Sequence, residues 1–100
     1  MEKNCCHGDR TKERSDSERR ALINRLKRIE GQIRGITRMI EADAYCVDIL
    51  TQVTAVEAAL GGFARAMLSE HIMTCVVKDI KEGNLETAEE LAATVERMLR

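Results

Sequence analysis

Residues 22–40 read LINRLKRIEGQIRGITRMI, and this stretch decides the class of fold. Its aliphatic side chains recur with gaps of four, three, four, three and four residues: Leu22, Leu26, Ile29, Ile33, Ile36 and Ile40. This spacing places them on one face of an α-helix, in a heptad-like stripe. Ser15 and Glu18 precede the stripe at capping-box spacing, so we expect a first helix over about residues 18–41.

The same rhythm continues after a short turn and predicts a second, longer helix. Its apolar positions are Ile49, Val53, Val56, Leu60, Phe63, Met67, Leu68, Ile72, Val76 and Ile80. Asp43 is the candidate cap at its start. Gly61 and Gly62 each cost about 1 kcal/mol inside a helix, so the helix bends there or another group approaches closely. Without a proline or a polar cluster the pair does not mark a loop, and we expect one helix over about residues 44–82.

A third helix completes a single helical domain. Gly83 suits the exit from the second helix, and Asn84 suits the cap of the next, which carries apolar positions over residues 85–99. Residues 1–16 hold almost no apolar side chains, so we expect a flexible tail there and one domain over residues 17–100. The predicted fold is all-α, with three helices in each protomer.

The composition agrees with helices and indicates an oligomer. The chain has 100 residues, with no proline or tryptophan, one tyrosine and one phenylalanine, which excludes β-sandwiches and α/β barrels. A chain this short and this poor in aromatic residues buries only a modest part of its surface alone, so we expect it to oligomerise. Polar residues follow Met1, and no apolar run approaches about 18 residues, so we expect a cytoplasmic protein with no membrane segment.

Charge is divided unevenly along the chain. The formal net charge is -1, but residues 10–38 carry ten basic and four acidic side chains, whereas residues 41–100 carry five basic and eleven acidic ones. Such asymmetry suggests that the basic part meets a polyanion, and a merely solvated charged face is the alternative.

Three residues point to a soft metal site. His71 and Cys75 are four apart, so on a helix they lie on one face at a spacing that a metal ion can bridge, although packed residues show the same spacing. Cys46 lies 25 residues earlier, roughly 38 Å along a continuous helix. One protomer cannot unite these residues, but two antiparallel copies of the second helix can. Two thiolates and one imidazole suit Cu(I) best, and zinc or nickel would need a further ligand.

Several motifs together resemble one known family. They are RLKRIEGQIRGI at residues 25–36, MIE at residues 39–41, Tyr45 with Cys46, DIL at residues 48–50, Gln52, His71 and Cys75. The chain resembles, over about residues 22–99, the copper-sensitive operon repressor family, the CsoR/RcnR/FrmR group. The resemblance implies an antiparallel helical-bundle dimer that pairs into a tetramer, a dimer of dimers. It further implies a repressor that binds operator double-stranded DNA and releases it on binding Cu(I), which derepresses copper efflux genes.

The resemblance also assigns residues to the metal site. Cys46 of one protomer, with His71 and Cys75 of its neighbour, corresponds to the Cu(I) ligands, one ion per protomer. Tyr45 corresponds to a residue behind these ligands.

A glutamate of the third helix is also implied behind the ligands. Glu90 is the closest match, with Glu86 and Glu89 as alternatives. A carboxylate that accepts the spare ring N–H of His71 would orient this ligand. An exposed helical glutamate and an interface tyrosine are the structural alternatives.

For DNA, the resemblance points to Arg25 and Arg65. The basic first helix extends this set with Lys27, Arg28, Arg34 and Arg38. Binding through such side chains should depend strongly on salt.

Cys5, Cys6 and His7 form a second cluster of soft donors. They could add ligands to a metal site, or they could be incidental residues of a disordered tail. Because the cluster could raise the coordination number, a nickel or cobalt sensor is the strongest rival within the family. His71 counts against a persulfide sensor, and Glu2 against a formaldehyde sensor, which carries proline at the second position.

Two other classes of protein compete with a repressor. A copper-buffering or chaperone protein would use the same donors without an operator. A thiol enzyme would need an oxyanion hole and a substrate pocket, which no motif supplies, so we expect neither catalysis nor a small-molecule substrate.

Overall fold

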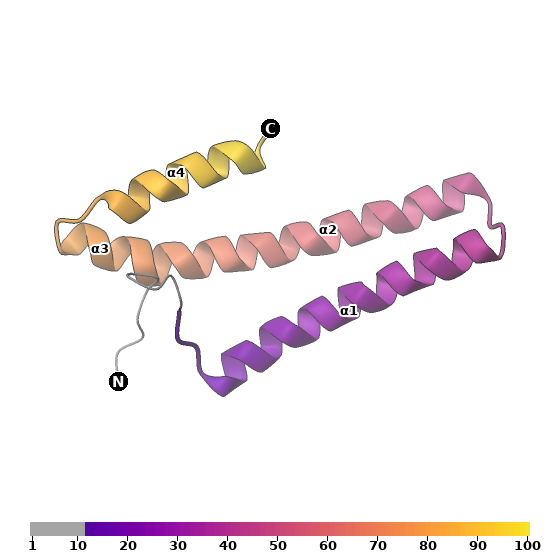
Figure 1. The fold of residues 1–100 in the computed structure, drawn as a ribbon, viewed down its shortest axis with the longest axis horizontal. Coiled ribbons are helices and arrows are strands. Elements are labelled where there is room, and N and C mark those ends of the chain that lie inside the picture. The colour runs from indigo at the N-terminus through magenta and orange to yellow at the C-terminus, as the bar shows by residue number, and fades with distance from the viewer. Residues whose placement is uncertain (1–11) are drawn as a thin grey trace. The chain divides into compact units, whose positions relative to one another are not determined.

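The computed structural model describes residues 12–100, in which every regular element is a helix (Figure 1). The elements are α1 (Asp16–Glu41), α2 (Cys46–His71), the π-helical turn η1 (Ile72–Val76), α3 (Val77–Lys81) and α4 (Glu86–Met98). The described residues form two compact units, residues 14–66 and residues 12–13 with 67–100. The all-α prediction is confirmed.

A capping box starts α1. The Glu18 N–H donates to Ser15 Oγ at 3.1 Å, and the Ser15 N–H donates to Glu18 Oε1 at 2.9 Å, so two backbone donors are satisfied reciprocally. The predicted box is confirmed. Because Ser15 itself is the cap, α1 begins at Asp16, two residues earlier than expected.

The end of α1 corrects one predicted cap. Asp43 adopts a left-handed conformation, with φ of 53°. Its N–H donates to the Ile40 carbonyl at 3.1 Å, and the Ala44 N–H donates to the Met39 carbonyl at 2.9 Å. These two bonds form a Schellman motif. Asp43 therefore closes α1, and the prediction that it caps the second helix is wrong; that helix begins at Cys46.

The second helix is continuous, as predicted, but contains a π turn. Helical structure runs over Cys46–Lys81, through Gly61 and Gly62. Within η1 the register changes, because the Val77 N–H donates to the Ile72 carbonyl five residues back. A π turn inserts one residue into an α-helix and occurs often at functional sites. The sequence pattern did not reveal it.

Gly83 ends the second helix as expected, but the prediction that Asn84 is the cap of the next helix is wrong, because the cap position of α4 is Leu85 and Asn84 lies one residue before it. Gly83 has φ of 84°, and its N–H donates to the Ile80 carbonyl at 3.0 Å. Asn84 Oδ1 then accepts the Glu86 N–H at 2.9 Å, in the first turn of α4. Within this unit α4 packs against both η1 and α3.

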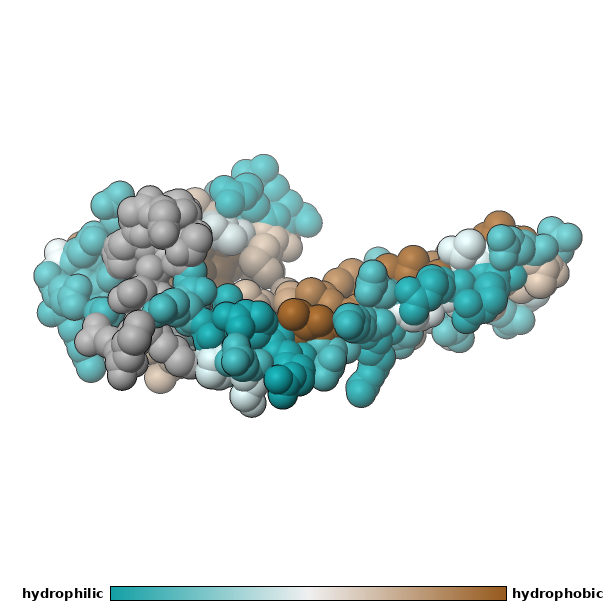
Figure 2. Space-filling view, turned by 60° about the horizontal axis from the view of Figure 1, so that its bottom comes forward, coloured by the Kyte–Doolittle hydropathy of each residue, from teal (hydrophilic) through white to brown (hydrophobic). Residues whose placement is uncertain are grey.

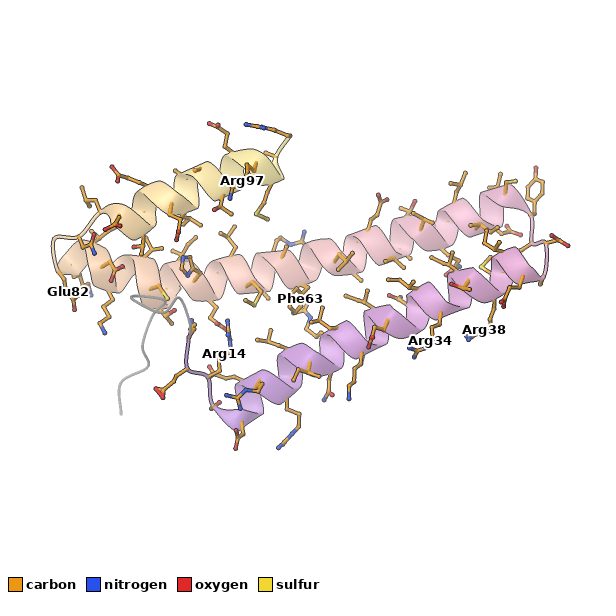
Figure 3. The ribbon with its side chains drawn as sticks, in the orientation of Figure 1. Arg14, Arg34, Arg38, Phe63, Glu82 and Arg97 are labelled. Carbon is orange, nitrogen blue, oxygen red and sulfur yellow. The ribbon has the colours of Figure 1, made fainter. Side chains whose placement is uncertain are left out.

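In the unit of residues 14–66, α1 and the first part of α2 run in opposite directions (Figure 1). Phe63 points from α2 toward α1 in Figure 3. Ile29 and Val56 are buried, at 6% and 8% exposure. The remaining aliphatic row of α1 is largely uncovered: Leu26, Ile33 and Ile40 are 40%, 48% and 58% exposed.

Apolar and hydrophilic residues stand side by side on the face shown in Figure 2. Leu26, Ile33 and Ile40 are three of the six residues of the heptad stripe of α1, so their exposure leaves half of that stripe available for another helix.

Length and composition alone would allow one helical stretch within residues 12–100 to cross a membrane. This stretch is Cys46–Lys81, with 36 residues and mean hydropathy of 1.3 in its most apolar window. The core helix of a soluble protein passes the same test, so the absence of a membrane segment stays a prediction.

Candidate metal centre and nucleic-acid interface

The first predicted ligand, Cys46, is the first residue of α2 and is exposed. The preceding carbonyl, of Tyr45, accepts the N–H groups of Asp48 at 3.0 Å and Ile49 at 3.2 Å, which sets the first turn. The Tyr45 side chain is 70% exposed. The thiol of Cys46 is thus exposed at the N-terminus of a helix.

The other two predicted ligands lie where α2 passes into η1. His71 is the last residue of α2 and is half-buried, whereas Cys75 lies within η1 with 0% exposure. The Thr74 hydroxyl donates to the Glu70 carbonyl at 2.7 Å and lies 3.6 Å from Cys75 Sγ. His71 and Cys75 therefore belong to one helical turn, as their spacing predicts.

A single chain does not assemble the predicted site. Cys46 and His71 are the two ends of a 26-residue helix, which spans about 39 Å. In the part of the chain that the structure describes, no three side chains of His, Cys, Asp or Glu form a group able to hold a metal ion. The donor set itself, two thiols and an imidazole, fits a soft ion if two chains supply it.

The residues expected behind the ligands lie on different elements. Tyr45 adjoins Cys46, and Glu90 lies in α4, the helix that packs against η1. The backbone carbonyl of Glu90 accepts the Thr94 hydroxyl at 2.9 Å. The predicted accessory donors Cys5, Cys6 and His7 lie outside the described residues.

Arg25 of α1 and Arg65 of α2 meet over the glycine pair. A Cβ added at Gly62 would lie 3.2 Å from Arg25 Nη2 and 3.7 Å from Arg65 Nη2. A Cβ at Gly61 would lie 3.5 Å from Arg65 Nη1. The missing side chains let two guanidinium groups lie against the backbone of α2, which explains the glycines by close approach. The sequence marked the pair as unusual but did not connect it with these arginines.

The other predicted DNA contacts, all on α1, extend the pair of Arg25 and Arg65 into what we call the basic surface. Lys27, Arg28, Arg34 and Arg38 are all exposed. Arg34 and Arg38 project from the side of α1 away from α2 in Figure 3. Among residues 12–100, no carboxylate pairs with these four side chains, or with Arg25 and Arg65. Clustered guanidinium and ammonium groups without acidic partners suit a phosphate backbone.

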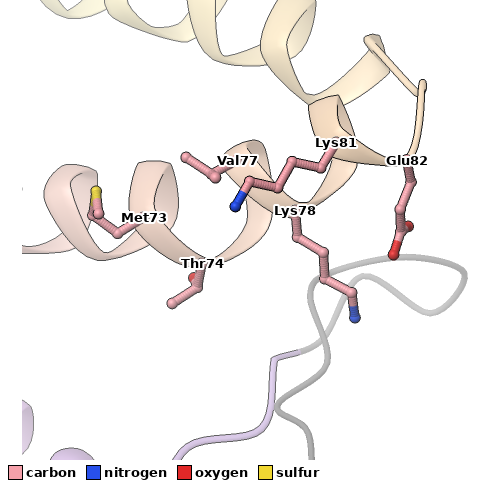
Figure 4. Close-up of a pocket in the computed structure, with 6 residues that line it drawn as sticks. All are labelled: Met73, Thr74, Val77, Lys78, Lys81 and Glu82. Atoms are coloured by element: carbon pink, nitrogen blue, oxygen red, sulfur yellow. The ribbon is translucent and has the colours of Figure 1, made fainter.

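A pocket of 430 Å³ runs along η1 and α3 (Figure 4). Its lining is Met73, Thr74, Val77, Lys78, Lys81 and Glu82. None of the three predicted metal ligands lines it, so this pocket is separate from the candidate metal centre.

A family model for metal-sensitive transcriptional repressors matches residues 18–97, which include nearly all of α1, α2, η1, α3 and α4. The chain belongs to the metal-sensitive transcriptional repressor family. The resemblance drawn from the sequence is confirmed. Since the members of this family are repressors and not enzymes, membership also favours a repressor over a copper-buffering protein or a thiol enzyme.

Two relatives within this repressor family are named for copper sensing. The copper-sensing transcriptional repressor CsoR of Bacillus subtilis is 51% identical over 75 residues, which cover 75% of this chain and 74% of the relative. The copper-sensing transcriptional repressor RicR of Mycobacterium tuberculosis is 47% identical over 79 residues, covering 76% and 82%.

Two solved structures share the fold of this repressor. The copper-sensing repressor CsoR with Cu(I) from Geobacillus thermodenitrificans superposes with a TM-score of 0.84 at 39% identity, over 88% of this chain and 93% of that one. The nickel-responsive transcriptional regulator InrS superposes with a TM-score of 0.69, also at 39% identity, over 84% and 92%.

Proposed function

We propose that this repressor senses Cu(I): it holds operator double-stranded DNA in its metal-free form and releases the DNA on binding Cu(I), which derepresses copper efflux or resistance genes. The observation that carries the proposal is the donor set of two thiols and one imidazole at the ends of α2. Thiolates select Cu(I) over harder ions, and three donors match its low coordination number. The relatives named for copper sensing support the same metal.

The site is shared between protomers, one ion for each. Cys46 of one protomer joins His71 and Cys75 of its neighbour when two copies of α2 pack antiparallel, and twofold symmetry makes two equivalent sites. The length of α2 supports this arrangement, because its two ends cannot meet within one chain.

Uncovered apolar side chains support the dimer and its pairing into a tetramer. On α2, Val47, Leu50 and Leu60 are 55%, 61% and 44% exposed, in addition to the bare aliphatic row of α1. Burying a Leu, Ile or Val side chain contributes about 1.5–3 kcal/mol. Packing against further copies of the chain would cover these side chains, and the resulting homotetramer is expected in the cytoplasm.

The DNA contacts come from the basic surface of α1 with Arg65. These side chains contact phosphates, and such contacts fix the position of the protein on the duplex without reading the base sequence. The choice of operator therefore rests partly on DNA shape. Because each phosphate contact displaces counterions, binding should weaken steeply with salt.

Binding of Cu(I) then lowers the affinity for DNA, and binding of DNA lowers the affinity for Cu(I), through α2. Bound Cu(I) would link the start of one α2 to the end of its partner. In the metal-bound form the Glu90 carboxylate would accept the spare ring N–H of His71 and orient it, and Tyr45 would pack beside Cys46. Cu(I) and DNA weaken the binding of each other only if they favour different arrangements of the helices. The change of arrangement would move the basic surfaces of the protomers relative to one another.

Nickel is the second candidate metal, because the fold also matches the nickel-responsive InrS. Nickel, cobalt or zinc would need a ligand beyond the three named here, and Cys5, Cys6 or His7 could supply it.

Titration of the full chain, bound to the DNA upstream of its own gene, tests the proposal. Under anaerobic conditions Cu(I) should release the DNA at one ion per protomer, while Ni²⁺ and Zn²⁺ should not. Undiminished DNA affinity with the copper site filled would contradict the mechanism, and release by Ni²⁺ alone would favour the second candidate.

A further inference from the structure

Lys12 is fastened to the turn that carries the predicted metal ligands. Its Nζ lies 2.9 Å from Glu70 Oε1 and donates to Thr74 Oγ1 at 2.7 Å. The Lys12 side chain is only 7% exposed and that of Glu70 is 25% exposed. One ammonium thus binds two side chains four residues apart, each immediately before a predicted ligand, His71 or Cys75.

The contact of Lys12 with Glu70 and Thr74 should be stronger than an ordinary surface ion pair. Exposed pairs contribute little, because water and salt screen them. Here the ammonium is largely removed from water and makes charge-assisted hydrogen bonds to two partners, which are stronger and more directional. The Thr74 hydroxyl that accepts from Lys12 also donates to the Glu70 carbonyl within the same turn. Lys12, Glu70 and Thr74 therefore form one connected polar cluster where α2 passes into η1.

The cluster lies beside a buried thiol, that of Cys75, and so bears on how a metal ion reaches it. Cys75 has 0% exposure, although the proposed site requires its sulfur to meet a metal ion held jointly by a second chain. The turn must open before that sulfur is reached. Thr74, which lies 3.6 Å from Cys75 Sγ, is the residue that Lys12 holds.

We propose that Lys12 is a positioning residue that latches η1 in the form that encloses Cys75, through its contacts with Glu70 and Thr74. Opening the latch exposes the thiol for the metal. Lys12 precedes the first residue of α1 by only four positions, so the latch also connects the metal-binding turn to the chain that enters the basic helix. The inference rests on the proposed function for the role of the metal, but not for the enclosure of the thiol.

The first test measures enclosure without metal or DNA. In a full chain with Cys5, Cys6 and Cys46 replaced by serine, iodoacetamide reports the accessibility of Cys75. Because this reagent is uncharged, loss of a lysine does not change its attraction to the protein. Lys12→Met should speed the modification about tenfold, since it frees a local opening that the latch opposes. Lys12→Arg keeps the charge and should stay within about twofold of the parent, as should Lys27→Met on α1.

Thr74→Val probes the same contact from its other side, so the test does not depend on one variant. It should also speed modification, and the double variant Lys12→Met/Thr74→Val should be faster than the parent by less than the product of the two single effects, because both substitutions remove the hydrogen bond from Lys12 to Thr74. The latch is overturned if Lys12→Met leaves the rate within about twofold of the parent, or if the two effects multiply.

The second test uses the chain with its native cysteines. Lys12→Met should bind Cu(I) about tenfold more tightly in competition with a chelator, because the cost of opening is removed from the binding equilibrium. Unchanged affinity would overturn the latch as a control on metal binding. Failure of Cu(I) to release DNA from the unaltered protein would instead contradict the proposed function, and the iodoacetamide result would stand.

Discussion

Arg25 Nη2 lies 3.2 Å from the position that a Cβ on Gly62 would occupy. This distance is tighter than ordinary van der Waals contact, so the glycine leaves room for a guanidinium group of α1 on the surface of α2. Arg65 approaches the same position at 3.7 Å. The absence of a side chain at Gly62 lets these two positive groups lie close together, and neither has an acidic partner among residues 12–100. An anion between them would relieve their repulsion.

Gly62→Ala should separate stability from DNA binding. A helix-interior glycine replaced by alanine gains about 1 kcal/mol, so the melting temperature should rise by roughly 4 °C. The new methyl group displaces the flexible end of Arg25, and DNA affinity should fall about fivefold. Calorimetry and fluorescence anisotropy measure the two effects.

Gly61→Ala is the matched control. Its Cβ would lie 3.5 Å from Arg65 Nη1, which is ordinary contact, so stability should rise with a smaller loss of DNA affinity. Equal loss of affinity in the two variants would show that the fit over Gly62 has no special role.

Neutralising the arginine pair should change the salt dependence of DNA binding. Arg25→Gln or Arg65→Gln should reduce the slope of log K against log salt by about 1 for each phosphate that the variant no longer neutralises. Arg97→Gln, on α4, removes an equal charge outside the basic surface and should leave the slope unchanged. A slope that drops equally in all three variants would indicate only an effect of net charge.

Ser15→Ala should destabilise the start of α1. The substitution removes the side-chain acceptor of the Glu18 N–H, at a cost of about 1 kcal/mol. Thermal unfolding should therefore occur a few degrees lower. Ser17→Ala, at an exposed position two residues after the cap, should have little effect; an equal loss there would argue against the capping box as the cause.

Local patterns were predictable because their causes lie within a few residues. Ser15 with Glu18 and the exit at Gly83 are such features, and so is the single long helix through the glycine pair. Asp43 was assigned to the wrong helix, because the residue types that cap a helix start also tolerate the left-handed conformation that ends one.

Features set by packing were not predictable. The π turn η1 lies where α4 packs against the second helix, and no periodicity of the sequence marks one inserted residue. The contact of Lys12 with Thr74 joins positions 62 residues apart, with no local signal. The spacing of His71 and Cys75 placed both on one turn, whereas the burial of Cys75 could be learned only from the structure.

Complementation between two cysteine variants tests whether two chains of this repressor share each Cu(I) site. Cys46→Ser and Cys75→Ser proteins each lack a thiol in every site, so neither alone should bind Cu(I) in the three-donor form.

After equal amounts are unfolded and refolded together, half of the dimers are mixed, and each mixed dimer regains one of its two sites. If the sites are shared, the mixture should bind Cu(I) with high affinity at about one quarter of the unaltered stoichiometry. No recovery above the two single variants, with mixed dimers shown to be present, would contradict a shared site.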